Sequence, residues 1–207
     1  MSHRFFSALR SRAAHARRAG LVGALLALLT VNTAAGDGAP VHEYLDEETG
    51  ATVTLVTQPL VFAYPRTDLA ANARDYVTLQ AAAVNRSGKL DYVVIAYFWS
   101  TVDPRLRQDA LPNPQPLLLQ ADDRILRLSL RGRTAREAGI GMVVDAPPGA
   151  SSPPNVYATD LETLRFIGAS RRLALVIDTE PSAFTYDLWE DRRPALRAFV
   201  KHLAGQN

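Results

Sequence analysis

Five arginines within 13 residues form the densest group of chemically useful side chains in this sequence; they are Arg124, Arg127, Arg131, Arg133 and Arg136. Leucines alternate with polar residues over 124–131, which predicts a strand with one wet face that aligns Arg127 with Arg131. Guanidinium groups pair with planar anions. The sequence therefore predicts a patch for an anionic partner at Arg127, Arg131 and Arg133. The alternative is ion pairing within the protein, to Asp122, Asp123 and Glu137.

Carboxylates are the second group that could do chemistry. Two facing carboxylates can hydrolyse glycosidic bonds, and the candidates are Glu43, Glu47, Glu48, Asp75, Asp91 and Asp103. The acids at 43–48 belong to an expected hairpin tip, where a solvated turn is the simpler interpretation. The spacing of a calcium-binding EF-hand is absent. Carboxylate-based hydrolysis therefore stays an alternative function.

Other common catalytic and metal-binding patterns are missing from the sequence. Only His42 and His202 follow the first 35 residues, and they could share a site only if the chain ends meet. Ser151 and Ser170 follow Gly-Ala, but both lack the second glycine of a nucleophile elbow. The absence of cysteine excludes disulfides and thiolate-bound zinc. We predict neither a cofactor nor a metal site.

Residues 1–35 have the pattern of a secretory signal peptide. Five arginines and no acid precede an apolar run at 21–31, which is shorter than the about 20 residues needed to span a bilayer. Small residues predict cleavage after Ala35 or Gly36, and an uncleaved anchor is the alternative. Arg17 and Arg18 lack the context of a twin-arginine signal, which favours Sec-type export. We expect a periplasmic or secreted protein with no transmembrane segment after signal removal.

The predicted leader also supplies the chain's excess of positive charge. The whole chain has 23 basic and 21 acidic residues, and loss of the five leader arginines leaves 18 against 21, a net charge of −3. Nucleic-acid binding requires positive charge to neutralise phosphates, so nucleic acid is not an expected partner. No internal repeat is present, and the length of 36–207 predicts a single domain.

Most of residues 36–207 have the pattern of short strands joined by tight turns. Val41–Asp46 and Ala51–Thr57 flank a turn in which Gly50 could take a positive φ. Asp75–Asn85 and Leu90–Ser100 predict the longest hairpin, and both alternating faces of its second strand are apolar. This strand should be central and covered on both sides. Further strands are expected at 59–64, 117–120, 124–131, 140–145, 172–178 and 184–189.

Helical patterns are few. A short helix is expected at 67–74, and a capping box at Thr159 and Glu162 predicts a second helix that ends near Gly168. Asp191 should cap a longer helix that runs to about Leu203. Its apolar stripe consists of Leu196, Phe199, Val200 and Leu203. We predict a mainly β fold: a β-sandwich or open β-barrel of about seven to nine short strands with two peripheral helices, the longer one C-terminal.

Three strings in the sequence, Glu47–Thr54, Asn72–Leu79 and Phe98–Arg105, resemble parts of uncharacterised exported proteins of proteobacteria. The resemblance covers roughly the first half of the mature chain. It implies export and no particular mechanism.

These patterns lead to one functional hypothesis and two alternatives. The hypothesis is an exported envelope protein, a non-enzymatic binding or structural module, whose partner is another envelope protein or an anionic surface component. The first alternative is the carboxylate hydrolase, acting on cell-wall or extracellular polymer. The second is a small-ligand carrier whose barrel is lined by Tyr76, Tyr92, Tyr97 or Trp99, residues that otherwise belong to the core.

Overall fold

The structure is a computed structural model of the 207-residue chain, and it describes residues 38–103, 114–141, 146, 153–179 and 182–205. All of them belong to one compact unit, Asp37–Asn207. The expected leader at 1–35 lies outside the described residues, as does most of the strand expected at 140–145.

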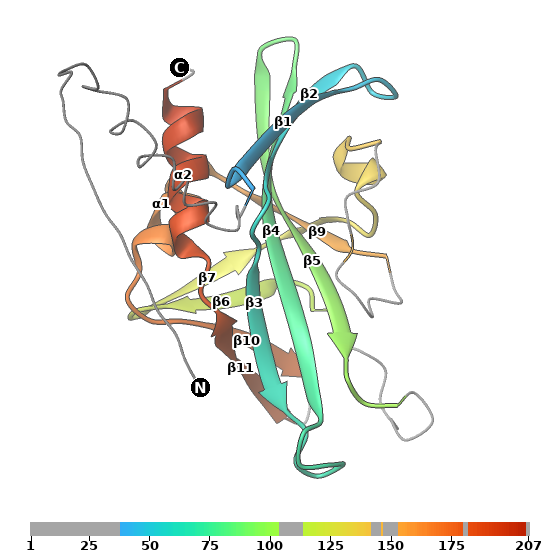
Figure 1. The fold of residues 1–207 in the computed structure, drawn as a ribbon, viewed down its shortest axis with the longest axis vertical. Helices are drawn as coiled ribbons and strands as arrows, with labels where there is room; N and C mark the ends of the chain where they lie inside the picture. Colours follow the sequence, from blue (N-terminus) through green and yellow to red (C-terminus); the bar gives the residue numbers. More distant parts are fainter. Residues whose placement is uncertain (1–37, 104–113, 142–145, 147–152, 180–181, 206–207) are drawn as a thin grey trace, which may run out of the picture. The chain divides into compact units, whose positions relative to one another are not determined.

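The described residues form one curled antiparallel sheet (Figure 1). Its strands are β1 (Val41–Asp46), β2 (Ala51–Val56), β3 (Leu60–Pro65), β4 (Arg74–Arg86), β5 (Lys89–Ser100), β6 (Leu117–Ala121), β7 (Arg124–Leu128), β8 (Leu130–Gly132), β9 (Asn155–Thr159), β10 (Leu173–Thr179) and β11 (Ser182–Glu190). They pair in the order β7-β6-β10-β11-β3-β4-β5-β9-β8. Strand β2 pairs with β1 and with the C-terminal half of β4. The long hairpin β4–β5 forms the centre of the sheet.

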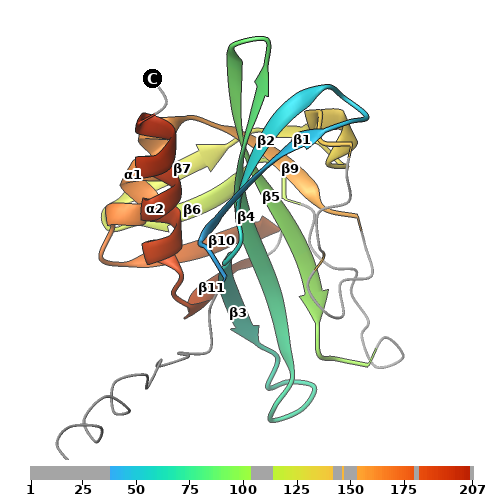
Figure 2. The ribbon, with the colours of Figure 1, turned by 45° about the horizontal axis from the view of Figure 1, so that its top comes forward.

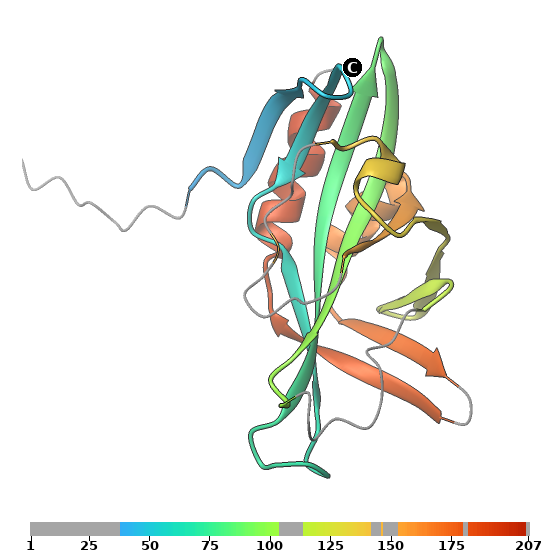
Figure 3. The ribbon, with the colours of Figure 1, turned by 90° about the vertical axis from the view of Figure 1, so that its right-hand side faces the viewer.

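The sheet closes on itself almost completely because its two end strands are one stretch of chain. Only Ser129 separates β7, which pairs with β6, from β8, which pairs with β9. At this break Ala158 N donates to Ser129 O at 2.8 Å. Strands β10 and β11 run at an angle to β4 and β5, which shows how strongly the sheet curls (Figure 3). The predicted mainly β fold with two helices is confirmed, and of its two forms the structure is the barrel.

The central strand β5 buries both of its faces, as its sequence predicts. Val94 and Ala96 belong to a first core inside the barrel, and Val93 and Ile95 belong to a second core on the outer side of the sheet. The alternating direction of side chains along a strand sends neighbouring residues to opposite cores. The sheet therefore stands between two apolar layers at this point.

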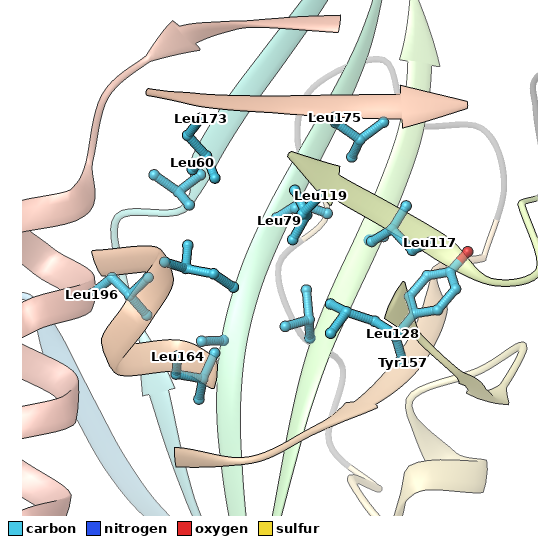
Figure 4. Close-up of a cluster of buried hydrophobic side chains, with 14 of the residues drawn as sticks. Leu60, Leu79, Leu117, Leu119, Leu128, Tyr157, Leu164, Leu173, Leu175 and Leu196 are labelled. Carbon is cyan, nitrogen blue, oxygen red and sulfur yellow. The ribbon is translucent and has the colours of Figure 1, made fainter. Parts of the chain in front are cut away.

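Two helices pack on the first core beside the barrel strands (Figures 1 and 2). They are α1 (Leu161–Ala169) and the longer α2 (Arg193–Ala204). The four predicted stripe residues of α2 are all buried. Figure 4 shows Leu196 and Leu164 from the helices facing Leu60, Leu79 and Leu119 from the strands. No helix in the described part of the chain is long and apolar enough to span a membrane.

Side chains cap both ends of α1, and those at its C-terminal end come from α2. Asp160, rather than the predicted Thr159, is the N-cap of α1, and its carboxylate accepts from Thr163 N at 2.7 Å. Arg197 of α2 donates from Nη1 to Gly168 O at 2.8 Å, and Arg193 donates to Ser170 O. Both arginines place positive charge at the C-terminal end of α1, where the helix dipole favours it.

The interior of the barrel is filled by side chains. Tyr157 is fully buried, and its hydroxyl donates to Pro114 O at 2.8 Å. Burial raises the pKa of Tyr157 to about 12. A cavity of about 20 Å³, lined mostly by apolar residues of the strands and both helices, lies beside Leu79 and Leu164. That volume is close to the minimum for one water molecule.

The second core is covered by the β1–β2 hairpin and by the segment 133–141. This segment contains a single 3-10 turn, η1 (Arg136–Ala138), which buries Ala138 and is followed by the buried Ile140. Figure 2 shows η1 (yellow) close to the tip of the hairpin (blue). Asp46, fully buried, accepts from Gly141 N, and Arg136 pairs with Glu48. These contacts hold the segment against the hairpin.

Asp46 should make the protein less stable in acid. Burial opposes its ionisation, but backbone N–H groups of Gly141, Glu48 and Thr49 outweigh that effect and lower its pKa. A lowered pKa contributes stability that is fully present above the unfolded-state pKa of about 3.9. This stability is lost as the pH falls through the folded-state pKa. Asp46→Asn should therefore lower the free energy of unfolding at pH 7 by about 1–3 kcal/mol.

Urea unfolding at pH 7 and at pH 3 measures this effect. The difference between wild type and Asp46→Asn should shrink at pH 3, while Asp123→Asn, in an exposed turn, should match wild type at both values. An equal difference at both pH values would contradict the assigned role of the ionised carboxylate.

Most expected elements are present, and one is wrong. The hairpin around Gly50, which has φ 65°, is confirmed, as are the strands of the longest hairpin. The helix expected at 67–74 is absent, because this stretch is the loop of the β3–β4 hairpin. Arg66 N donates to Ala73 O at 2.8 Å, which ties the loop ends together and leaves room only for turns.

Candidate functional site

The predicted arginine patch is divided in the structure. Arg127 and Arg133 are exposed, whereas Arg131 pairs with Asp91 of β5 at 3.1 Å. Its neighbours are also engaged: Arg136 pairs with Glu48, and the Arg124 guanidinium lies 4.8 Å from the centre of the Phe166 ring. Three of the five arginines, Arg124, Arg131 and Arg136, thus find partners other than the expected ones.

Those expected partners bind backbone groups instead. Asp122 accepts from Arg171 N and Arg172 N, both at 2.9 Å, and these bonds lower its pKa. Glu137 accepts from Arg133 N at 3.0 Å and from the Thr134 hydroxyl at 3.2 Å. Both acids therefore organise turns.

The candidate carboxylates are distributed over the molecule. Glu48 and Asp91 carry the two arginine pairs already described, and Asp75 pairs with Arg66 at 2.9 Å. Glu43 accepts from Thr54 and lies 3.4 Å from His202 Nε2. Each of these four has a cationic or ionisable basic partner. Glu47 and Asp103, the other two, are exposed.

A histidine of α2 contacts β1. His202 of α2 reaches Glu43 of β1, while His42 stacks on Tyr44 with ring centres 5.6 Å apart. Within the described residues, no group of three or more histidine and acidic side chains could hold a metal ion.

A row of side chains on the outer face of the sheet forms the strongest candidate site. In the strand register Asp187 of β11 lies opposite Ala63 of β3, Ala63 opposite Tyr76 of β4, and Tyr76 opposite Trp99 of β5. The neighbouring residues Val77 and Phe98 point to the first core, so the row faces away from it. Four strands spaced about 4.8 Å apart give the row a length of about 14 Å.

The aromatic rings of this row are held in fixed positions. Tyr76 and Trp99 stack with ring centres 4.1 Å apart and planes 11° apart. Trp99 Nε1 donates to the hydroxyl of the buried Thr78 at 3.0 Å, which fixes the indole. Both rings are half-buried, so each keeps part of its surface exposed to solvent while its neighbours fix its position.

Trp189 extends the row. The register of β11 against β3 shifts between Leu188 and Glu190, and such bulges redirect side chains. Trp189 is 54% exposed and meets Tyr76 edge to face with ring centres 6.3 Å apart. The Arg74 guanidinium lies 4.8 Å from the centre of its ring. We call Arg74, Tyr76, Trp99, Asp187 and Trp189 the aromatic face.

Both tryptophans of the chain belong to the aromatic face. The sequence predicts Tyr76 and Trp99 as residues of the core or of a carrier cavity, and Trp189 only as the end of a strand. The structure buries Tyr97 in the second core and packs Tyr92 against the first. The alternating pattern of β5 shows which residues share a face. It does not show how far the β1–β2 hairpin and residues 133–141 extend over the outer face.

The sequence matches no protein-family model, and comparisons with curated proteins and with solved structures find no match.

Proposed function

We propose that this protein is an exported envelope protein that works as a non-enzymatic binding module and that the aromatic face is its binding surface. Export is supported by the leader pattern at 1–35. Binding is supported by one observation above all: both tryptophans, a tyrosine and an arginine gather on one outer face. Tryptophan, tyrosine and arginine are the residue types that contribute most binding energy at interfaces.

The rigidity of the aromatic face favours binding. Side chains that are already fixed lose little conformational entropy when a ligand covers them. Stacking on Tyr76 and the hydrogen bond to Thr78 give Trp99 this property. Trp189 supplies the apolar area that remains open to solvent.

The two alternative functions have less support. A hydrolase would need two carboxylates facing each other, and Glu43, Glu48, Asp75 and Asp91 instead lie against basic side chains. A carrier would need an interior space for its ligand, whereas the cavity beside the helices has a volume of about 20 Å³.

Substitution of Trp189 should reduce binding of the protein to the cell envelope. The full-length chain, expressed with its own leader and purified from the cells, is mixed with an envelope fraction and sedimented. Trp189→Ala should lower the affinity at least about 10-fold, the range for a central interface tryptophan. Ile125→Ala is the matched control, because Ile125 is exposed to the same extent, 53%, but lies on β7. It should bind like wild type.

The same assay separates the aromatic face from the arginine patch. If Arg127→Glu with Arg133→Glu abolishes sedimentation and Trp189→Ala does not, the anionic-partner patch is the binding surface and our proposal is wrong.

Mass spectrometry of the purified protein tests export: a chain that starts at Gly36 or Asp37 supports it, and an unprocessed chain in the cytoplasm contradicts it.

A further inference from the structure

The aromatic face contains two charged side chains, Arg74 of β4 and Asp187 of β11. The guanidinium of Arg74 is held over Trp189 by stacking. Asp187 is exposed, two positions before Trp189 on the same strand. The aromatic rings are thus accompanied by a group of hydrogen-bond donors and a group of acceptors, with opposite charges.

The size of the face limits what can bind to it. Stable protein interfaces bury about 800 Å² on each partner and contain a contiguous apolar centre. In the described part of the chain the other exposed large apolar residues, Leu45 and Ile125, lie on β1 and β7, away from the row. Trp189 is therefore the one exposed large apolar residue of this face in the described part of the chain. A narrow row about 14 Å long suits a slender ligand.

A sugar ring has both an apolar face and a rim of hydroxyl groups, and these complement the rings and the charged groups of the aromatic face. One face of a pyranose carries C–H groups, which pack on the electron-rich face of an indole or phenol ring. Its rim carries hydroxyls, which both donate to carboxylates and accept from guanidinium groups. A neutral sugar also fits a site whose two charged groups have opposite signs. An oligosaccharide of a few rings fits the row in length as well.

We propose that the aromatic face binds a neutral glycan of the envelope, with sugar rings against Trp99 and Trp189 and with sugar hydroxyls bonded to Arg74 and Asp187. This inference rests on the proposed binding function and names its ligand class. Tyr76 holds the two tryptophans in position by contacting both rings.

The test removes one class of envelope component at a time before the sedimentation assay. Periodate cleaves the vicinal diols of sugars, protease removes protein, and organic solvent removes lipid. Binding of wild type should fall at least about 10-fold after periodate treatment and persist after the other two. Loss after protease or after solvent extraction, with binding retained after periodate, would overturn the glycan assignment.

Variants connect this result to the aromatic face. Asp187→Asn and Arg74→Gln should each weaken binding about 3–10-fold on untreated envelope, since each loses a charge-assisted hydrogen bond. Asp178→Asn, an exposed aspartate on neighbouring β10, is the matched control and should bind like wild type. Equal binding of Asp187→Asn, Arg74→Gln and wild type would contradict the assigned hydrogen bonds.

Intrinsic fluorescence provides a second readout, because every tryptophan of the chain lies on this face. Glycans released from the envelope should change the emission saturably, and the change should be smaller in Trp189→Phe. If binding depends on Trp189 but survives periodate, the glycan inference fails and the binding function stands. If Trp189→Ala binds like wild type, both fail.

Discussion

Replacement of Phe199 by alanine should lower the free energy of unfolding by about 3–5 kcal/mol. The ring is fully buried on α2 and belongs to the first core. Its removal forfeits the burial of a large apolar surface and leaves a cavity that a close-packed interior fills only in part. Because α2 also contacts β1 and β2, loosening it should weaken the attachment of the first hairpin.

Urea unfolding with an unchanged slope measures this loss. Lys201→Ala, an exposed position on the same helix, is the control and should change stability by about 0.5 kcal/mol or less. A loss below about 1 kcal/mol for Phe199→Ala would mean that α2 is not a structural part of the core.

Removal of Arg66 should cost about 3 kcal/mol, because it leaves Asp75 buried without its cation. The Arg66 guanidinium lies 2.9 Å from Asp75 Oδ2, and their side chains are 13% and 7% exposed. The Ser100 hydroxyl donates to the other carboxylate oxygen. This arrangement gives Asp75, one of the candidate catalytic acids, a structural role at the end of the barrel.

Thermal or urea unfolding of Arg66→Met measures the cost. Asp68→Asn is the control, since it removes only the exposed partner of Arg66, which is 62% exposed, and should cost less than about 1 kcal/mol. The double variant Arg66→Met with Asp75→Leu should recover much of the loss because no buried charge remains. Equal costs for Arg66→Met and Asp68→Asn would show that the buried pair contributes nothing special.

Local patterns in the sequence were sufficient for most elements. The alternation of Val93, Val94, Ile95 and Ala96 correctly places a central strand between two apolar layers. The spacing of the apolar residues in α2 correctly predicts its buried stripe. Both features depend on neighbours in the chain, which is why they can be read from it.

Errors arose where contacts between distant residues decide the structure. Residues 67–73 contain good helix formers, but the pairing of β3 with β4 makes them a hairpin loop, and a helix of one turn has no means to propagate. Distant residues also decide the partners of Arg131, Arg124 and Arg136, which come from β5, α1 and the first hairpin. The anionic-partner patch itself stays a prediction.

The aromatic face could not be predicted for the same reason. Tyr76, Trp99 and Trp189 come from three strands, and β11 reaches β4 and β5 only by pairing with β3, a strand far from it in the sequence. Each of them alone resembles an ordinary core aromatic. Only the register Asp187–Ala63–Tyr76–Trp99 brings them into one row.

The nearly closed sheet pairs strands that are far apart in the sequence, which makes folding a non-local process. β11 docks on β3 by pairing Leu188 with Phe62, residues from opposite ends of the described chain. Topologies dominated by such pairs fold slowly, in milliseconds to seconds. Until β10 and β11 have been synthesised, the edges of β6 and β3 remain open to strands of other molecules. A growing chain is thus most exposed to aggregation just before its last two strands are available.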